Sequence, residues 1–154
     1  MRTIELSNSR KRAKVSNGDF NILSQYTWSL CPWGYACTQV FVKNGLSKTI
    51  TMHKFMFPNR STDHVNNDRL DNRRKNLRAA TKKQNNQNVS LRITSKTGYK
   101  GVCWDKSRRR FLCRVANTYV GSFTCKHEAA KAYNKQAAKQ FGRFAHLNTI
   151  RGAK

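Results

Sequence analysis

The chain has 154 residues, of which 31 are lysine or arginine and only 7 are aspartate or glutamate, so its formal net charge is +24. That length suits one ordinary domain or two small ones, and a charge of that size is tolerated mainly when the partner is a polyanion such as DNA or RNA. No apolar run reaches the ~20 residues that cross a bilayer, and residues 1–6 lack the apolar core of an export signal. We therefore expect no membrane partner and a cytoplasmic protein.

Short β-type runs alternate with turns over residues 1–57. Asn44-Gly45 lies between two such runs and predicts a hairpin, because both residues tolerate positive φ. This segment is interpreted as a small sheet that supports the residues after position 57, with Trp28, Trp33 and Tyr35 assigned to its core. The strands are expected at 28–30, 35–42 and 48–51.

Two short helices are expected in the same segment. The first spans residues 19–26 and is expected to be capped by Asn17 or Asp19. The second spans residues 52–57 and ends at Pro58. His53, on the second helix, is interpreted as structural or phosphate-contacting.

The scarce carboxylates are concentrated in one stretch. Three of the seven, Asp63, Asp68 and Asp71, lie within residues 63–71, and His64 stands beside the first. In a chain so poor in acids, this arrangement favours a metal-dependent phosphodiesterase site. The alternative for Asp63-His64 alone is an Asx-turn with a surface histidine.

Phosphodiester cleavage needs a base for water and a cation beside the phosphorane and the leaving oxygen. His64 is a suitable base, since the ordinary pKa of histidine is near ~6.5. Asp63 and Asn85 offer hard oxygen ligands, which suit Mg²⁺ or Mn²⁺ and leave positions for phosphate and water.

The local pattern predicts strand, turn, strand and helix around this cation. The first strand ends at His64, and Asn66-Asn67-Asp68 supplies the turn. A short strand follows at 76–80, and Thr81 is expected to cap a helix through residue 88. Asn85 would then face back toward the strand ends.

Asp63-His64, Asn76-Leu77-Arg78 and Asn85 together resemble the HNH family of endonucleases, most closely the homing endonucleases of phages and group I introns. The resemblance implies a ββα-metal module that cuts DNA, leaving 5′-phosphate and 3′-hydroxyl ends. A phage origin would place it in the cytoplasm of a bacterial host.

Carried over residue by residue, the resemblance makes His64 the general base and Asp63 and Asn85 the ligands of one divalent cation, Mg²⁺ or Mn²⁺. Asn76 would hold the motif's loop so that His64 is oriented. Asn67 stands where glycine is frequent, and asparagine also tolerates positive φ. No structural zinc is expected, because the five cysteines show no CxxC or Cys/His zinc spacing.

Basic residues follow the motif closely. They could clamp phosphates beside the metal, although a solvated basic face explains any single one nearly as well. They are Arg73, Arg74, Lys75 and Arg78.

Residues 89–97 are interpreted as a linker or a strap over DNA. From Gly98 the pattern predicts three strands over 99–104, 110–115 and 118–123, and then a helix from Cys125 to Phe141. Thr124 is expected to cap that helix, and Gly142 to follow it in the αL conformation.

Residues 98–148 resemble the APETALA/ethylene-response-factor DNA-binding domain. The residues that carry this resemblance are Tyr99-Lys100-Gly101-Val102, Trp104, Phe111, Val120-Gly121-Ser122-Phe123, Glu128 to Tyr133 and Phe144 to Asn148. That family lays its three-stranded sheet in the major groove. Cys103 stands where a base-reading arginine is usual, and Trp104 has a core position as its alternative. The matching contact positions are Lys100, Trp104, Arg109, Arg110 and Arg114.

The predicted fold class is α+β. An N-terminal small sheet plus HNH nuclease module is expected over 1–88, with the motif core at 59–88, followed by a three-stranded antiparallel sheet packed on one helix. The predicted function is a metal-dependent endonuclease acting on double-stranded DNA as a monomer, which would nick, or as a homodimer. The alternatives are a non-catalytic DNA-binding regulator with a degenerate nuclease module and an RNA-binding protein.

Overall fold

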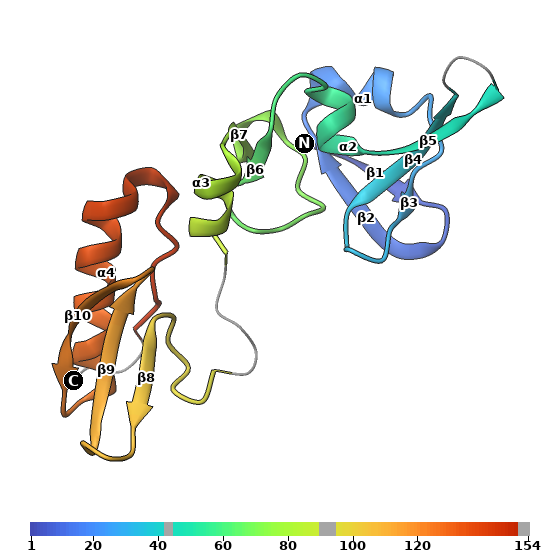
Figure 1. The fold of residues 1–154 in the computed structure, drawn as a ribbon. Helices are drawn as coiled ribbons and strands as arrows, with labels where there is room; N and C mark the ends of the chain where they lie inside the picture. Colours follow the sequence, from blue (N-terminus) through green and yellow to red (C-terminus); the bar gives the residue numbers. More distant parts are fainter. Residues whose placement is uncertain (42–44, 90–94, 151–154) are drawn as a thin grey trace. The chain divides into compact units, whose positions relative to one another are not determined.

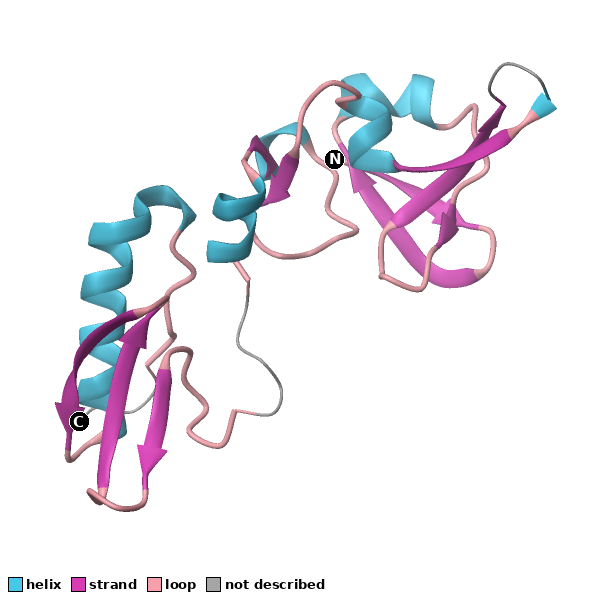
Figure 2. Ribbon diagram, viewed as in Figure 1, coloured by secondary structure: helices cyan, strands magenta, loops and turns pink. Residues whose placement is uncertain are grey.

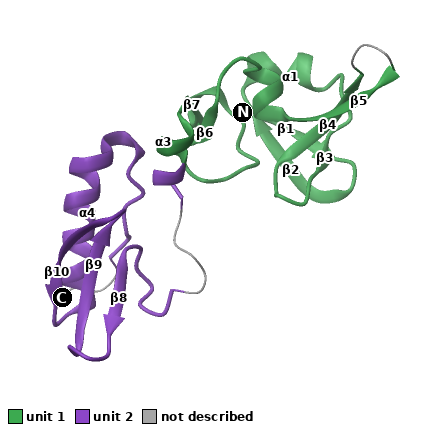
Figure 3. Ribbon diagram, viewed as in Figure 1, with its two compact units in different colours: residues 1–85 green, residues 86–154 purple. Residues whose placement is uncertain are grey.

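The structure is a computed structural model, and it describes residues 1–41, 45–89 and 95–150. The chain divides into two compact units, residues 1–85 and 86–154 (Figures 1 and 3). Small antiparallel sheets and few helices make up both units, in agreement with a mixed α and β class (Figure 2). Within these ranges, no helix has the length and apolar character that a membrane span requires.

Unit 1 begins with two small sheets and two short helices and ends with a strand–loop–strand–helix segment. Its elements are β1 (Arg2–Leu6), β2 (Ser9–Val15), α1 (Asn17–Leu23), β3 (Ser29–Leu30), β4 (Ala36–Phe41), β5 (Ser47–Thr51), α2 (Met52–Met56), β6 (Thr62–His64), the 3-10 helix η2 (Arg74–Asn76), β7 (Leu77–Ala79) and α3 (Lys82–Gln87), which crosses the boundary.

The β1–β2 hairpin supplies much of the core of unit 1. Alternate residues on each strand point inward, so Ile4 and Leu6 meet Ala13 and Val15. Trp28 completes this core at 1% exposure, and its Nε1 donates to the Leu23 carbonyl at 2.7 Å. The core assignment of Trp28 is therefore confirmed.

The predicted hairpin in the second sheet is confirmed, because β4 and β5 pair antiparallel from Cys37↔Thr51 to Phe41↔Ser47. Asn44 of its turn lies outside the described residues. The core assignment of Trp33 is wrong, since 69% of this residue is exposed in the turn between β3 and β4.

The expected cap of the first helix is also wrong. Ser16 occupies the N-cap position of α1, and Asp19 lies inside the helix. The Asp19 carboxylate accepts hydrogen bonds from the Arg74 guanidinium at 2.6–3.0 Å instead. A charged partner binds a carboxylate more strongly than a backbone amide does, so the tertiary contact prevails.

The expected strand–turn–strand–helix order is present at the end of unit 1. β6 pairs antiparallel with β7, and Asn67 in the intervening loop has φ of 60°, as glycine-like turn geometry requires. The Thr81 cap is confirmed: its Oγ1 accepts from the Gln84 amide at 3.2 Å, while Gln84 Oε1 accepts from the Thr81 amide at 2.8 Å.

The loop between β6 and β7 is fastened to β2. The Lys14 amide donates to the Leu70 carbonyl and the Asn72 amide donates to the Lys14 carbonyl, both at 2.8 Å. The Lys14 ammonium also contacts Asp68 at 3.0 Å. The N-terminal hairpin thus fixes the conformation of the loop that follows His64.

Unit 2 is a three-stranded sheet of order β10-β9-β8 with one helix on its inner face. Its elements are β8 (Val102–Asp105), β9 (Arg110–Val115), β10 (Thr118–Phe123), α4 (Lys126–Phe141) and the 3-10 helix η3 (Gly142–Phe144). Small residues of α4 let the helix approach closely, and Ala129, Ala130 and Ala137 are fully buried.

Gly101 marks the closest approach in unit 2. A Cβ placed there would lie 2.2 Å from a ring carbon of Tyr133 and 2.4 Å from the Arg114 carbonyl, and the residue has φ of +72°. Only glycine meets both conditions.

Two local predictions in unit 2 need correction. Cys125, not Thr124, is the N-cap of α4, and Gly142 has ψ of −129°, outside the αL region. Residues 90–94 of the predicted linker lie outside the described residues. At the end of the predicted linker, Thr97 is buried and its hydroxyl donates to the Val102 carbonyl at 2.8 Å.

Candidate functional site

His64 lies at the end of β6 and is 6% exposed. Its Nε2 is 3.3 Å from Asn72 Oδ1. Its ring meets the His53 ring edge-on, with centroids 5.2 Å apart and an interplanar angle of 87°, and the Tyr35 ring at 5.9 Å. Burial lowers the pKa of His64, and the hydrogen bond to Asn72 and the charge of Asp63 oppose this. The imidazole is therefore kept neutral near pH 7.

Asp63 faces the other side of β6, because neighbouring residues of a strand point in opposite directions. It is opposite Arg78 in the register and is 3% exposed. Arg78 donates from Nε at 2.9 Å and from a terminal nitrogen at 2.7 Å to Asp63 Oδ2. A buried carboxylate is thus compensated by a guanidinium in this structure.

Asn76 is buried and joins both ends of the loop. Its amide nitrogen donates to Asn66 Oδ1 at 2.9 Å and to the Asp71 carbonyl at 2.8 Å, and its Oδ1 accepts from the Asn66 amide at 3.1 Å. The Val65 amide, next to His64, donates to the Asn76 carbonyl at 2.9 Å. These bonds hold the backbone that follows His64.

Asn85 lies in α3 and is half-buried, with its backbone amide bonded to the Thr81 carbonyl at 2.9 Å. No group of three or more His, Cys, Asp or Glu side chains suited to a metal occurs in the described ranges. An Asp63 carboxylate with an Asn85 amide is a two-ligand oxygen set, and such a set suits a cation that keeps several waters, as Mg²⁺ does. A cation bound there would compete with Arg78 for the Asp63 carboxylate.

The other two clustered acids are engaged elsewhere. Asp71 has no exposed surface, and Arg73 Nε donates to its Oδ1 at 2.6 Å while Asn66 donates to its Oδ2 at 2.9 Å. The hydrogen bond from Arg73 holds the pKa of Asp71 below its usual value. Asp68 contacts Lys14. These carboxylates stabilise the loop.

The arginines after the motif are likewise engaged within unit 1. Arg73 binds Asp71, Arg78 binds Asp63, and Arg74 binds Asp19 while 62% of its own side chain stays exposed. Of the three, Arg74 is the one best placed to reach a phosphate as well.

Lys100, an expected DNA contact, is used inside unit 2. Its ammonium donates to the carbonyls of Gln87 at 2.9 Å and Val89 at 2.6 Å. Burial lowers its pKa. The carbonyls at the end of a helix attract a cation, which explains this position.

The remaining expected DNA contacts do not all lie on one face of the unit 2 sheet. Trp104 is opposite Phe111 in the register, on the same face as buried Val102 and Cys113. Its ring contacts the Phe111 ring with centroids 4.7 Å apart and planes tilted by 58°, and it is 45% exposed. Arg110 and Arg114 alternate with these residues and are exposed on the opposite, outer face. Arg109 lies in the β8–β9 turn with φ of 51°.

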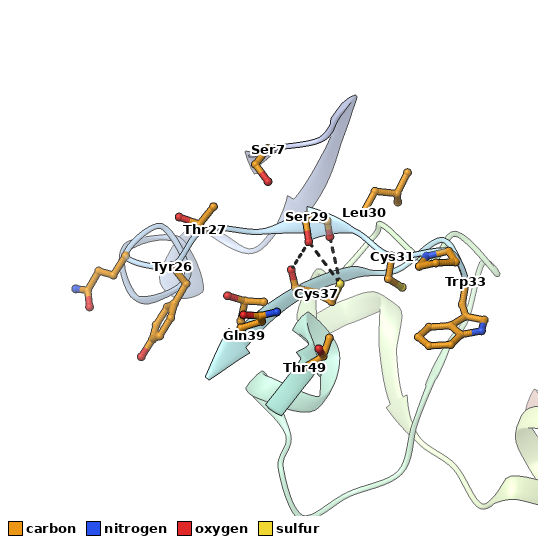
Figure 4. Close-up of a pocket in the computed structure, with 13 residues that line it drawn as sticks. Ser7, Tyr26, Thr27, Ser29, Leu30, Cys31, Trp33, Cys37, Gln39 and Thr49 are labelled. Carbon is orange, nitrogen blue, oxygen red and sulfur yellow. Dashed lines mark hydrogen bonds between the residues drawn. The ribbon is translucent and has the colours of Figure 1, made fainter. Parts of the chain in front are cut away.

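A hollow of about 730 Å³ lies over β3, β4 and β5, between Tyr26 and Trp33 (Figure 4). Its lining contains hydroxyl, amide, thiol and aromatic groups, and Ser29 bonds to Cys37 within it. The lining has no carboxylate, imidazole or basic side chain, so this hollow has neither a base nor a phosphate-binding group.

Three neighbours of His64 could not be recognised as its partners from the sequence. Asn72 lies within the motif, but nothing in its spacing marks it as a partner of His64. The sequence predicts a core position for Tyr35 and a structural or phosphate-contacting role for His53, and neither prediction involves His64. Their contacts arise only from folding, because His53 comes from α2 and Tyr35 from the turn before β4.

The chain is similar to a protein of Acanthamoeba polyphaga mimivirus that is named as an uncharacterized HNH endonuclease. The two are 28% identical over 147 residues, which covers 90% of this chain and 75% of that protein. The similarity therefore extends beyond unit 1 into unit 2. No family model matches the chain, and no solved structure matches it.

Proposed function

We propose that this chain is a metal-dependent DNA endonuclease of the HNH, homing type. The observation that carries the proposal is the order of Asp63, His64, Asn76 and Asn85 along strand, loop, strand and helix, with Asn76 bonded to both ends of the loop. Similarity to a viral protein named as an HNH endonuclease supports the same interpretation.

In the proposed reaction His64 takes a proton from a water molecule as the water oxygen attacks phosphorus. The bond from phosphorus to the 3′-oxygen breaks, which leaves a 5′-phosphate and a 3′-oxygen that takes up a proton. Asp63 and Asn85 would hold one Mg²⁺ or Mn²⁺, which supplies positive charge beside the phosphate and the leaving oxygen. Asn76 keeps the loop, and so the base, in place.

A cation at Asp63 would compete with the Arg78 guanidinium for the carboxylate. Arg78 occupies Asp63 Oδ2 in this structure, and its side chain is only 13% exposed. Once displaced, the guanidinium would lie beside a phosphate-binding cation, where it can bind a phosphate oxygen. Arg73 and Arg74 would add positive potential around the same strand ends.

The outer face of the unit 2 sheet is proposed as the anchor for duplex DNA. Arg110 and Arg114 project from it, with Arg109 in the adjoining turn. Trp104 lies on the other face of the sheet, against Phe111, so it would contact DNA only at the edge of this interface. Lys100 would act indirectly, because its bonds to the Gln87 and Val89 carbonyls hold the protein chain that precedes β8. Such contacts supply affinity, while unit 1 would supply the chemistry.

Plasmid cleavage tests this proposal. Supercoiled DNA incubated with the protein and Mg²⁺ should be nicked or linearised, and EDTA should abolish the reaction. His64→Ala and Asn85→Ala should lose cleavage while a gel shift shows that DNA binding is kept, because phosphate contacts supply the affinity. Nicked product alone indicates action as a monomer, and linear product at early times indicates a homodimer.

The second candidate is a DNA-binding regulator in which the nuclease module is a scaffold. The burial of His64 and the engagement of Asp63 by Arg78 favour this candidate. Binding of duplex DNA without cleavage in Mg²⁺ or Mn²⁺ would support the regulator and contradict the enzyme. Competition with RNA in the same gel shift tests whether duplex DNA is the preferred partner.

A further inference from the structure

The surroundings of His64 contain two polar groups that the proposed chemistry does not use. Asn72 is 1% exposed, and His53 lies in α2 beside the end of β6. Each has one buried nitrogen, Asn72 Nδ2 and His53 Nδ1, for which the described residues offer no hydrogen-bond partner. Buried groups of this kind cost stability, so a chain that keeps two of them beside one imidazole calls for a reason.

Asn72 contacts one nitrogen of the His64 ring. Its Oδ1 lies 3.3 Å from His64 Nε2, and an amide oxygen can only accept, so Nε2 carries the proton. A neutral imidazole protonated at Nε2 has its basic lone pair at Nδ1. Asn72 is itself held by its backbone amide, which donates to the Lys14 carbonyl on β2. The tautomer of His64 is therefore linked to the N-terminal hairpin.

The His53 ring packs against the same His64 ring. The two imidazoles meet edge-on at 87°, and the Tyr35 ring lies 5.1 Å from His53 and 5.9 Å from His64. Thr51 Oγ1 lies 3.2 Å from His53 Nε2 and fixes the His53 ring in turn. Burial lowers the pKa of His53 to about 4, so His53 stays neutral and does not repel a proton that His64 takes up.

We propose that Asn72 and His53 are positioning residues for His64, in which Asn72 fixes the proton on Nε2 and His53 fixes the orientation of the ring. The role of His64 as a base rests on the proposed function, whereas the tautomer and orientation are properties of the folded chain alone. Partners that orient metal-bound histidines alter affinity or activity about 10- to 100-fold when removed, and we expect an effect of similar size for this base.

Nitrogen NMR of the protein labelled with ¹⁵N-histidine reads the tautomer directly. The chain has four histidines, and His127, whose Nδ1 is 2.8 Å from the Tyr99 hydroxyl in unit 2, is an internal reference. Asn72→Ala should make the two His64 nitrogens more alike, as in a mixture of tautomers. Asn72→Asp should keep the wild-type pattern, because a carboxylate also accepts from Nε2. Asn8→Ala, which removes an amide bonded to Leu30, is the matched control.

Cleavage kinetics test whether this placement matters for the reaction. We expect Asn72→Ala and His53→Ala to lower kcat about 10- to 100-fold with little change in KM, and Asn72→Asp and His53→Phe to recover most of it. His64 signals that stay unchanged in Asn72→Ala would overturn the inference, as would unchanged kcat in an active protein whose tautomer had changed. If the wild-type protein cut no DNA, the proposed function would fail, and the NMR result would still decide how His64 is held.

Discussion

The Asp63–Arg78 pair offers the sharpest test of the candidate metal site. The Asp63 side chain is buried at 4% exposure and that of Arg78 is 13% exposed, so Arg78→Ala leaves a buried carboxylate without its cationic partner. Removing one partner of a buried pair costs about 3–5 kcal/mol. With a urea dependence of about 1–2 kcal/mol per molar, unit 1 should unfold about 2–3 M earlier in EDTA.

Arg12→Ala is the matched control. It breaks the Arg12–Glu5 pair, whose side chains are 59% and 79% exposed, and such a pair contributes about 0–1 kcal/mol. Tryptophan fluorescence is a suitable probe, because Trp28 is 1% exposed in unit 1 and should change most on unfolding, whereas Trp33 and Trp104 are already 69% and 45% exposed.

Mg²⁺ should then rescue the Arg78→Ala protein, because a cation at Asp63 replaces the lost guanidinium. At a hundredfold excess over Kd the gain is about 2.7 kcal/mol. Adding Asp63→Asn should remove this response, and the wild-type protein should respond less, since Arg78 competes for Asp63. The reasoning is refuted if Arg78→Ala behaves like Arg12→Ala, or if Mg²⁺ stabilises the Asp63→Asn/Arg78→Ala protein equally.

Three further outcomes are expected. The pKa of His53 is lowered to about 4, so between pH 6.5 and 4 the unfolded chain binds a proton there that the folded chain does not. Stability should therefore fall as the pH is lowered, by about 2 kcal/mol from pH 7 to pH 5. Urea titrations at these two pH values should show less of this loss in His53→Phe. Gly101→Ala should destabilise unit 2 by about 3 kcal/mol or more, because the added methyl group clashes with Tyr133. Gly18→Ala is the control: Gly18 lies in α1 with open space around it, so this substitution should be neutral or slightly stabilising. Thermal melts of both variants measure the difference. Arg114→Ala should weaken DNA binding and reduce the slope of log affinity against log salt by about 0.9, and an unchanged slope would remove the outer face of the sheet from the interface.

Patterns confined to a few neighbouring residues were predictable from the sequence. The Asn67 turn follows from its tolerance of positive φ, the Thr81 cap from a Gln three residues later, and α4 from alanines at helical spacing. Each depends on local backbone geometry, which a short window contains. The net charge and the order of the motif residues can also be read directly from the sequence, and the proposed activity follows from them.

Partners distant in the chain were not predictable in this way. Arg74 binds Asp19 from 55 residues away, and Lys14 holds the loop after His64 from 54 residues away. A run of arginines beside a phosphodiesterase motif has the same pattern whether it faces solvent or neutralises buried acids. Only the folded chain decides, because the free energy of pairing a buried carboxylate depends on which cation the topology brings within hydrogen-bonding distance. The sequence thus determined which chemical groups are present, and the tertiary structure decided that His64 is held by Asn72 and His53 and that Asp63 faces Arg78.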